Sequence, residues 1–311
     1  MTSAFTFPGQ GSQAVGMGQA LAENFPAARA VFEEVDEALS QKLTTIMWEG
    51  PDEAITLTEN AQPALMAVSM AVVRVLEQEK GLNLATQAKF VAGHSLGEYS
   101  ALAAAGVFSL ADTARLLKTR GQAMQQAVPV GQGAMAALLG LEIADADAVA
   151  KAAAEDEVCQ AANDNAPGQV VISGSKGAVE RAVELAKEKG ARRAMLLPVS
   201  APFHCTLMQP AADAMAGALA DVDMNAPVVP VMANISASPL SDPSDIRESL
   251  VQQVTGMVRW RECVEAMAES GVTSLYELGA GKVLSGLAKR INRELSASAI
   301  GAPDDIAAFE A

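Results

Sequence analysis

The sequence predicts a mixed α/β protein in which a large α/β domain contains a second, smaller α/β unit as an insertion. Two observations lead to this prediction. Short apolar stretches typical of buried strands are followed by segments whose apolar residues recur with helical spacing. Between residues 128 and 198 the pattern changes to strand, helix, strand, strand, helix, strand, which is the ferredoxin-like order. We therefore expect a ferredoxin-like small domain at 128–198, inserted into a large domain formed by residues 1–127 and 199–311.

The first part of the large domain is expected to alternate strands with helices. Its first strand ends in Pro8-Gly9, which suits a loop. Pro63 is tolerated in the first turn of a helix, and Gly106 suits the end of one. The elements expected here are strands at 4–7 and 90–92 and helices at 17–40, 62–79, 96–105 and 110–127.

The rest of the chain continues in two parts. The small domain is expected to contain strands at 134–141, 158–163, 169–173 and 194–198 and helices at 146–154 and 178–189. After it we expect helical structure within 206–220, a strand at 227–234, two helices within 244–270, a strand at 273–278 and a helix at 282–295. The tail after Ser296 is small and acidic, and we expect it to be loose.

The composition is that of an ordinary globular protein and argues against several classes of partner. The chain has 311 residues, half of them apolar, which is enough for a sizeable core. Its formal net charge of −15 argues against nucleic acid or an anionic membrane as the main partner, because both require a positive field. No uninterrupted apolar stretch is long enough to span a bilayer. Residues 1–13 lack the basic start and apolar run of a signal peptide.

Three cysteines, Cys159, Cys205 and Cys263, are an odd number without CxxC spacing. They are expected to be free thiols in a reducing compartment rather than a disulfide framework or a metal site. We therefore expect a cytoplasmic protein without a metal.

The strongest chemical signal is Gly93-His94-Ser95-Leu96-Gly97, which fits the G-x-S-x-G nucleophile elbow. A short apolar strand precedes it and a helix follows it, as the motif requires. On such a sharp turn, side chains at the two glycine positions would collide with the neighbouring strand and helix. The serine hydroxyl projects over a helix N-terminus, where free N–H groups favour negative charge. Ser95 is therefore the candidate nucleophile.

A serine nucleophile needs a base, and the chain has two histidines. His94 adjoins Ser95 along the backbone, so its ring is expected to point away from the hydroxyl and to have a packing role. His204 follows Pro202-Phe203 in a loop after the small domain, and it becomes the favoured base as the remaining partner. Its neighbour Cys205 is expected to be structural.

Two further features stay open on the residues alone. Arg120 could bind a carboxylate with its planar guanidinium, but a solvated surface arginine is the better interpretation of its helix. The glycine-rich segment Gly9–Ala14 loosely matches a relaxed dinucleotide-binding fingerprint, although Pro8 disturbs the entry from the strand. Alternatively this segment is a tight loop that presents the backbone N–H of Gln10 to the active site, or a plain surface turn.

Taken together, these motifs resemble the malonyl-CoA:acyl-carrier-protein transacylase family of bacterial type II fatty-acid synthesis. The resemblance covers nearly the whole chain. Its motifs are FPGQGSQ at 7–13, GHSLGEY at 93–99, LLKTRGQAM at 116–124, NAPGQVVISG at 165–174, APFHC at 201–205 and GAGKVL at 279–284. The resemblance implies an α/β-hydrolase-like large domain, a ferredoxin-like small domain and an active site in the cleft between them.

The resemblance also implies roles for single residues. Ser95 would be acylated in a ping-pong reaction, and His204 would act as general base and then general acid. The backbone N–H groups of Gln10 and Leu96 would form the oxyanion hole, and Arg120 would bind the free carboxylate of the malonyl group. Further residues implied at the substrate site are Gln253, which would orient His204, and Asn163 and Asn165, which would line the small-domain side of the cleft.

Substrate and partners follow from the same resemblance. Malonyl-CoA and acyl carrier protein would be the reactants, with no resident cofactor, and we expect a monomer. The carrier protein is acidic, so Arg193, Lys289 and Arg290 are candidate docking residues, although they equally suit solvated positions. Leu96 and Phe203 fit the malonyl-selective pattern of related polyketide acyltransferases. Many stand-alone bacterial relatives carry Ser before the histidine, so Phe203 departs from them.

Three other functions remain to be separated from malonyl transfer. A serine hydrolase would use the same elbow with water as the acceptor. A dinucleotide-binding oxidoreductase would use Gly9–Ala14. A non-catalytic carrier-binding module would not need Ser95, His204 and Arg120 together.

Overall fold

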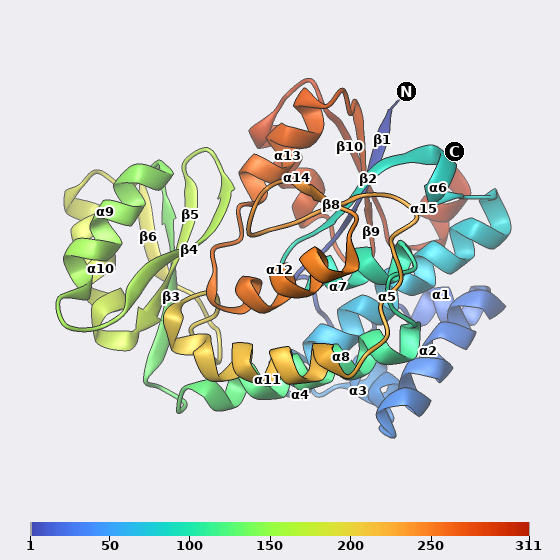
Figure 1. Cartoon of the computed structure of the whole chain (residues 1–311), viewed down its shortest axis with the longest axis horizontal. Helices are drawn as coiled ribbons and strands as arrows, with labels where there is room; N and C mark the ends of the chain where they lie inside the picture. Colours follow the sequence, from blue (N-terminus) through green and yellow to red (C-terminus); the bar gives the residue numbers. More distant parts are fainter. Residues whose placement is uncertain (1, 311) are drawn as a thin grey trace.

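The computed structural model describes residues 2–310. In this part of the chain the strands form two sheets, one of six strands and one of four. Figure 1 shows the smaller sheet at one end of the molecule, beside a larger body in which helices lie on both sides of the other sheet. The mixed α/β class predicted from the sequence is confirmed.

The large sheet has the order β10-β9-β1-β2-β7-β8. All neighbours are parallel except β7 and β8, which form an antiparallel edge pair. A parallel sheet needs helices on both faces, which explains why its central strands are buried along most of their length. The strands are β1 (Ser3–Phe7), β2 (Ala88–Gly93), β7 (Val231–Met232), β8 (Pro239–Leu240), β9 (Ser274–Leu278) and β10 (Ser296–Ile300).

Alternate residues of the central strands bury into different cores. Phe5, Phe7 and Val91 belong to one cluster, and Ala4 and Phe90 to the cluster on the opposite face. The first face is covered chiefly by α2 (Pro26–Leu39), α5 (Thr58–Lys80), α7 (Leu96–Ala104), α8 (Leu110–Ala127), α11 (Gln209–Ala220) and α12 (Pro243–Thr255), and the second by α13 (Trp260–Glu269) and α14 (Val283–Ile291). Shorter helical segments are α1 (Gln19–Asn24), α3 (Leu43–Glu49), α4 (Asp52–Thr56), α6 (Leu84–Gln87), η1 (Thr206–Met208) and α15 (Pro303–Ala308).

The small sheet has the order β4-β5-β3-β6 and is antiparallel. With two helices between its strands, this is the ferredoxin-like arrangement that the sequence predicts. One face packs against α9 and α10, and the other contributes Met135, Ala162 and Val171 to the core of the large body. The elements are β3 (Gly133–Leu139), α9 (Ile143–Ala154), β4 (Cys159–Ala166), β5 (Gln169–Ser175), α10 (Lys176–Glu188) and β6 (Arg193–Leu196).

Backbone and side-chain bonds tie the small sheet to the large body. The N–H of Asp164 in β4 donates to the carbonyl of Val258 (3.0 Å), and the N–H of Val258 donates to the carbonyl of Ala162 (2.9 Å). The buried carboxylate of Asp164 also pairs with Arg261 of α13, with 2.8 Å between Oδ2 and Nη2. These contacts fix the position of β4 relative to the large body.

Several predicted elements differ from the observed ones. The helix expected at 17–40 is two helices, because Pro26 starts α2 as its first residue and interrupts the hydrogen bonds of α1. The helix expected to open at Pro63 begins earlier, at Thr58, and contains Pro63. The strand expected at 227–234 is reduced to β7, since Pro227 and Pro230 cannot donate to a ladder.

The tail after Ser296 is ordered, so the prediction of a loose tail is wrong. Residues 296–300 pair in parallel with β9, and α15 follows. In this edge strand Ala297 and Ile300 are buried, Ser296 and Ser298 are exposed, and the residue at 299 is half-buried. Five residues that alternate between serine and small apolar side chains give only a weak strand signal. For this reason the composition of the tail wrongly indicated a loose segment. Among residues 2–310 no helix is long and apolar enough to cross a membrane.

Candidate active site

Ser95 sits on a strained turn between β2 and α7. Its backbone angles are φ 54° and ψ −111°, a positive φ that costs a non-glycine residue energy and persists only where the surroundings enforce it. A Cβ on Gly93 would come within 1.8 Å of the backbone of Gly97, and a Cβ on Gly97 within 2.2 Å of the carbonyl oxygen of Phe7. Both glycines are therefore required by close backbone approach, as the elbow motif predicts.

The structure brings His204 to Ser95 across 109 residues of sequence. Its Nε2 lies 2.7 Å from Ser95 Oγ. Its Nδ1 lies 2.9 Å from the backbone carbonyl oxygen of Gln253 and 3.2 Å from that of Gly256. A carbonyl can only accept, so Nδ1 carries the hydrogen and Nε2 presents its lone pair to the serine hydroxyl. A neutral backbone carbonyl thus stands where hydrolase triads have a carboxylate.

The surroundings keep His204 uncharged. Its side chain is buried, and burial followed by the positive charge of Arg120 lowers the pKa of His204 to about 3. The imidazole is therefore neutral at neutral pH and free to accept a proton. The loop that carries His204 is held on both sides of it: Gln125 of α8 donates to the carbonyl of Ser200 (3.3 Å), and the N–H of Thr206 donates to Gln160 of β4 (2.8 Å).

Arg120 is buried beside the serine, with 1% of its surface exposed, and is not the solvated surface arginine favoured by its sequence context. Its Nη2 donates to Ser95 Oγ (3.2 Å) and to Gln253 Oε1 (2.9 Å), and its Nη1 donates to Gln62 Oε1 (2.7 Å). The helix offered one signal: Thr113, Leu117, Arg120 and Met124 recur at spacings of four, three and four, and all are buried. Neutral amides leave the positive charge of Arg120 available to an anion.

A pocket of about 530 Å³ opens over Ser95 and separates the two sheet units. Gln10 and Leu96 line it near the serine, and Met124 and Phe203 line its apolar wall. The serine's own backbone N–H points away, toward Asn234 Oδ1 (2.8 Å). Leu96 is the first residue of α7, where N–H groups have no partner within the helix.

The small sheet forms the side of the pocket opposite the large sheet. Asn163 and Asn165 of β4 both line it, together with Met135 and Val171. Asn165 Oδ1 lies 2.8 Å from Nε2 of His94, so His94 faces the small sheet and not the serine hydroxyl. This geometry matches the expectation that the two histidines of the chain have different roles.

The loop at Gly9–Ala14 is not a dinucleotide-binding turn. No helix follows it directly, since α1 begins at Gln19. A Cβ on Gly9 would meet the carbonyl oxygen of His94 at 2.6 Å, so the loop packs tightly against the elbow. Gln10 is held there by Thr58, whose hydroxyl donates to Gln10 Oε1 (3.0 Å).

Sequence reasoning missed four buried polar residues that support the site. Two of them are on α5: Gln62 contacts Arg120, and Thr58 contacts Gln10. Glu98 lies in the first turn of α7, and Asn234 follows β7. The one available signal was Glu98, because a carboxylate three residues after the nucleophile falls on a helix with no other charged residue. Gln253 was expected to orient His204 at the substrate site: its backbone carbonyl lies 2.9 Å from His204 Nδ1, while its side chain lies beneath the pocket, fully buried, and reaches Arg120.

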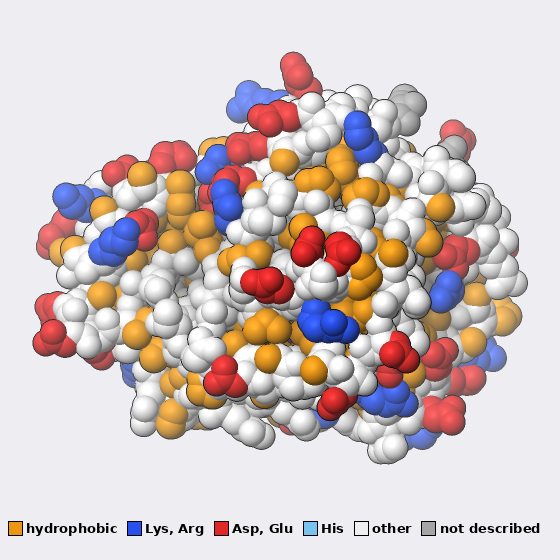
Figure 2. Space-filling view, viewed as in Figure 1, with side chains coloured by type: hydrophobic (Ala, Val, Ile, Leu, Met, Phe, Trp, Pro, Cys, Tyr) orange, Lys and Arg blue, Asp and Glu red, His pale blue; other side chains and the backbone are white. Residues whose placement is uncertain are grey.

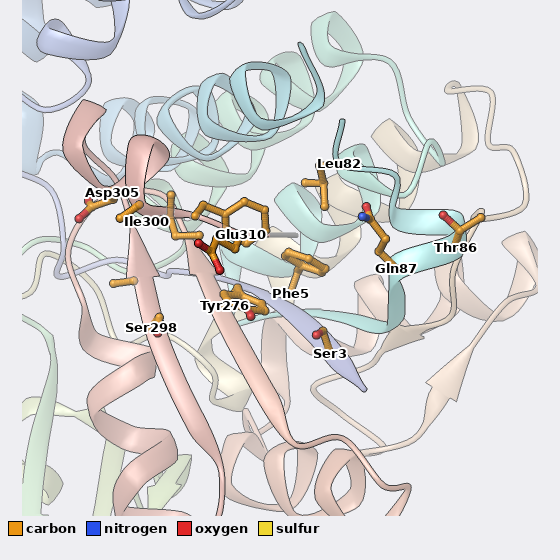
Figure 3. Close-up of a pocket in the computed structure, with 13 residues that line it drawn as sticks. Ser3, Phe5, Leu82, Thr86, Gln87, Tyr276, Ser298, Ile300, Asp305 and Glu310 are labelled. Carbon is orange, nitrogen blue, oxygen red and sulfur yellow. The ribbon is translucent and has the colours of Figure 1, made fainter. Parts of the chain in front are cut away.

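A second pocket, of about 790 Å³, lies elsewhere on the large sheet (Figure 3). Alternate residues of the strands line it, among them Phe5, Tyr276 and Ile300. Its charged lining residues are Asp305 and Glu310, which do not suit an anionic ligand. Within residues 2–310 no cluster of His, Cys, Asp and Glu could hold a metal ion.

Known proteins match this chain over nearly its whole length. Residues 4–294 match the family model described as an acyl transferase domain. The malonyl CoA-acyl carrier protein transacylase of Bacillus subtilis (strain 168) is 48% identical over 307 residues, which is 97% of this chain and 94% of that protein. The chain belongs to the malonyl-CoA:acyl-carrier-protein transacylase family.

Solved structures of transacylases superpose closely on this fold. The acyl-carrier-protein S-malonyltransferase of Bartonella henselae has a TM-score of 0.97 and 62% identity, covering 99% of this chain and 98% of that one. A malonyl transacylase in complex with its type II PKS acyl-carrier protein has a TM-score of 0.95 and 44% identity, covering 99% of this chain and 98% of that one. The α/β-hydrolase-like large unit and the ferredoxin-like small unit are thus shared with transacylase structures. Membership in the family excludes the oxidoreductase hypothesis.

Proposed function

We infer that this enzyme transfers the malonyl group of malonyl-CoA to the phosphopantetheine thiol of acyl carrier protein, and so supplies fatty-acid synthesis. The reaction is that of an acyl-carrier-protein S-malonyltransferase. The observation that supports it most directly is the buried guanidinium of Arg120 within 3.2 Å of Ser95 Oγ. A nucleophile with a fixed cation beside it suits an acyl group that ends in a carboxylate.

In the proposed first half-reaction, Ser95 Oγ attacks the thioester carbonyl and its proton passes to His204 Nε2. The N–H groups of Gln10 and Leu96 would stabilise the oxyanion of the tetrahedral intermediate. Collapse of the intermediate breaks the C–S bond, and the leaving thiolate of coenzyme A takes the proton from His204. The products are malonyl-Ser95 and free coenzyme A.

The second half-reaction reverses these steps with a different thiol. His204 takes the proton of the phosphopantetheine thiol, the thiolate attacks the ester carbonyl, and Ser95 leaves with the proton returned to its oxygen. Water would compete with the thiol, so Met124, Met135 and Val171 in the pocket wall serve to exclude it.

Arg120 is proposed to bind the malonyl carboxylate during both steps. An acetyl group lacks this carboxylate, so discrimination would come from a charge-assisted interaction. Phe203 lines the same pocket and is nearly buried, and it would crowd a methyl branch on the acyl chain. Asn163 and Asn165 would contact the substrate from the small sheet.

Docking of the acidic carrier protein is proposed at the exposed basic residues Arg193, Lys289 and Arg290. Arg193 starts β6, which leads into pocket residues 197–199, and Arg290 donates to Gln169 Oε1 (3.2 Å) where α14 meets β5. Figure 2 shows charges of both signs interspersed over the visible face, with no broad basic field. We therefore expect a small effect of Arg193→Ala, Lys289→Ala or Arg290→Ala: a salt-dependent rise in KM for carrier protein and unchanged acylation by malonyl-CoA.

We also propose that residues 128–198 form the small domain and residues 1–127 with 199–311 the large one, and that the enzyme is a cytoplasmic monomer. The three cysteines are free and buried, which suits a reducing compartment. Light scattering of the purified protein would test the monomer.

Intact-mass measurement after mixing with malonyl-CoA tests the function. The wild-type enzyme should gain the mass of one malonyl group and lose it on addition of holo carrier protein. Ser95→Ala should gain nothing. A persistent adduct on Ser95→Ala would refute the assigned nucleophile, and rapid loss of the adduct without carrier protein would favour the hydrolase alternative.

A further inference from the structure

Beneath the active site lies a buried carboxylate, Glu98, that the reaction above does not use. It sits in the first turn of α7, three residues after Ser95, and only 2% of its surface is exposed. Burying a carboxylate is costly unless its oxygens accept hydrogen bonds. The partners of Glu98 are therefore informative.

One oxygen of Glu98 joins two separate supports of the site. Its Oε2 accepts from the backbone N–H of Asn234 (3.0 Å) and from the side-chain Nε2 of Gln253 (2.8 Å). Asn234 holds the elbow, because its Oδ1 accepts the N–H of Ser95 (2.8 Å) and its Nδ2 donates to the carbonyl of Gly93 (2.7 Å). Glu98 thus connects α7, the segment after β7 and α12 at one point.

The contact with Gln253 decides which way its amide faces. Nε2 donates to Glu98 Oε2 and to the carbonyl of Ser95 (3.0 Å), which leaves Oε1 to accept from Arg120 Nη2 (2.9 Å). If the amide were flipped, its oxygen would face two acceptors and its NH2 would face the guanidinium. Each contact would then be repulsive or unmade.

We propose that Glu98 is a positioning residue for malonyl selection: by accepting the amide N–H of Gln253, it keeps the Gln253 oxygen on Arg120 and so holds the guanidinium beside Ser95. The inference rests on the proposed role of Arg120 as the carboxylate-binding residue. Glu98 does not touch the substrate pocket; it acts through Gln253. Its role is that of a hydrogen-bond acceptor and does not require its charge.

The electrostatics of the site agree with an acceptor role. Burial raises the pKa of Glu98 to about 7, although hydrogen bonds from Gln253 and Asn234 act in the opposite direction. Around neutral pH the group is therefore protonated in part of the molecules. A protonated carboxyl still has an oxygen that can accept both N–H groups.

Two matched variants separate the position of the acceptor oxygen of residue 98 from its negative charge. Glu98→Gln keeps the length of the side chain and one acceptor oxygen but removes the charge. Glu98→Asp keeps the charge but withdraws the oxygens by one methylene from Gln253. The rate of acyl-Ser95 formation is measured for malonyl-CoA and for acetyl-CoA by quenched flow and intact mass, with wild type and Arg120→Ala alongside. Thermal unfolding checks that each variant is folded.

We expect Glu98→Gln to stay within about threefold of wild type for both substrates. Glu98→Asp should lose malonyl acylation by roughly 10- to 100-fold, because Arg120 would no longer be held where it makes its charge-assisted hydrogen bond to the malonyl carboxylate. Its acetyl acylation should change much less, so its malonyl preference should fall toward that of Arg120→Ala. Merely structural damage would slow both substrates alike.

Three results would overturn the proposal. In the first, Glu98→Gln is impaired and Glu98→Asp is not, which would mean that the charge matters and the hydrogen bond does not. In the second, both variants resemble wild type. In the third, Glu98→Asp slows both substrates equally. A different failure, in which Arg120→Ala itself keeps its malonyl preference, would refute the proposed role of Arg120 and not that of Glu98 alone.

Discussion

The floor and the roof of the active-site pocket are built differently. The floor, which we define as Ser95, Arg120, Gln253, Asn234 and Glu98, belongs to the large sheet and its helices, and its side chains are linked by a continuous set of hydrogen bonds. The roof, defined as Met135, Asn163, Asn165 and Val171, belongs to the small sheet and is half apolar.

The difference indicates a division of labour. A buried polar network holds atoms at fixed positions, as proton transfer and carboxylate binding require. An apolar surface held by a few contacts excludes water and still lets a long pantetheine arm enter. Changes that break the hydrogen bonds of the floor should therefore slow acylation, and changes in the roof should alter the fate of the acyl-enzyme.

The largest expected effect follows from His204→Ala, which removes the base bonded to Ser95 of the floor. Without the base, Ser95 keeps its proton, and both half-reactions should slow on the order of 10⁴-fold or more. Steady-state transfer and the rate of malonyl-enzyme formation measure this loss. Retention of more than a few per cent of the activity would mean that another group acts as the base.

Arg120→Ala should have the next largest effect, and one that depends on the substrate. Malonyl acylation should fall by roughly 10²- to 10³-fold, while acetyl acylation falls much less, because a buried charge-assisted interaction is lost only for malonyl. The ratio of the two acylation rates is the measurement. An unchanged ratio would contradict carboxylate binding by this residue.

The pH dependence of acylation tests the protonation state of His204. Because the pKa of His204 is lowered to about 3, the base stays deprotonated as pH falls, so acylation should show no loss due to His204 between pH 8 and 5. Arg120 contributes to this lowering, so Arg120→Ala should raise the apparent pKa of His204. An acid limb near pH 6.5 in the wild-type profile would contradict the assignment.

Stability should respond to His204 in the same sense as to a carboxylate whose pKa is lowered by folding, falling as the pH falls. The pKa of His204 in the folded protein lies below the ordinary value of 6.5, so the unfolded chain takes up a proton between pH 6.5 and 3 that the folded protein does not. This residue therefore lowers the free energy of unfolding as pH falls through that window. His204→Gln should lack this contribution, which urea unfolding at pH 7 and pH 5 would measure.

The smallest effect is expected from loosening the roof. Arg261→Met leaves the buried Asp164 carboxylate without its partly exposed partner and should cost about 1–3 kcal/mol of unfolding free energy. Acylation should be nearly normal, but malonyl-Ser95 should hydrolyse faster without carrier protein. Arg74→Met is the matched control, because it breaks an exposed pair with Glu77 worth less than about 1 kcal/mol. Equal hydrolysis in both variants would contradict a water-excluding role for the roof.

Much of the fold was predictable because its signals are local. The elbow at 93–97 requires glycine on both sides of Ser95, and the packing confirms that need. The ferredoxin-like order of residues 133–196 follows from alternating strand and helix patterns. The tail was mispredicted because an edge strand of small residues has little apolar contrast, and its pairing with β9 depends on a distant strand.

The nucleophile and its base could be named from the sequence alone, since one motif and two histidines leave little choice. Three-dimensional packing decided everything that depends on long-range approach. Arg120 looked like a surface residue until α8 placed it under Ser95, and Glu98, Asn234 and Gln253 are up to 155 residues apart. Hydrogen bonds between such positions leave no periodic trace in a sequence, because each partner is set by the path of the backbone and not by its neighbours in the chain.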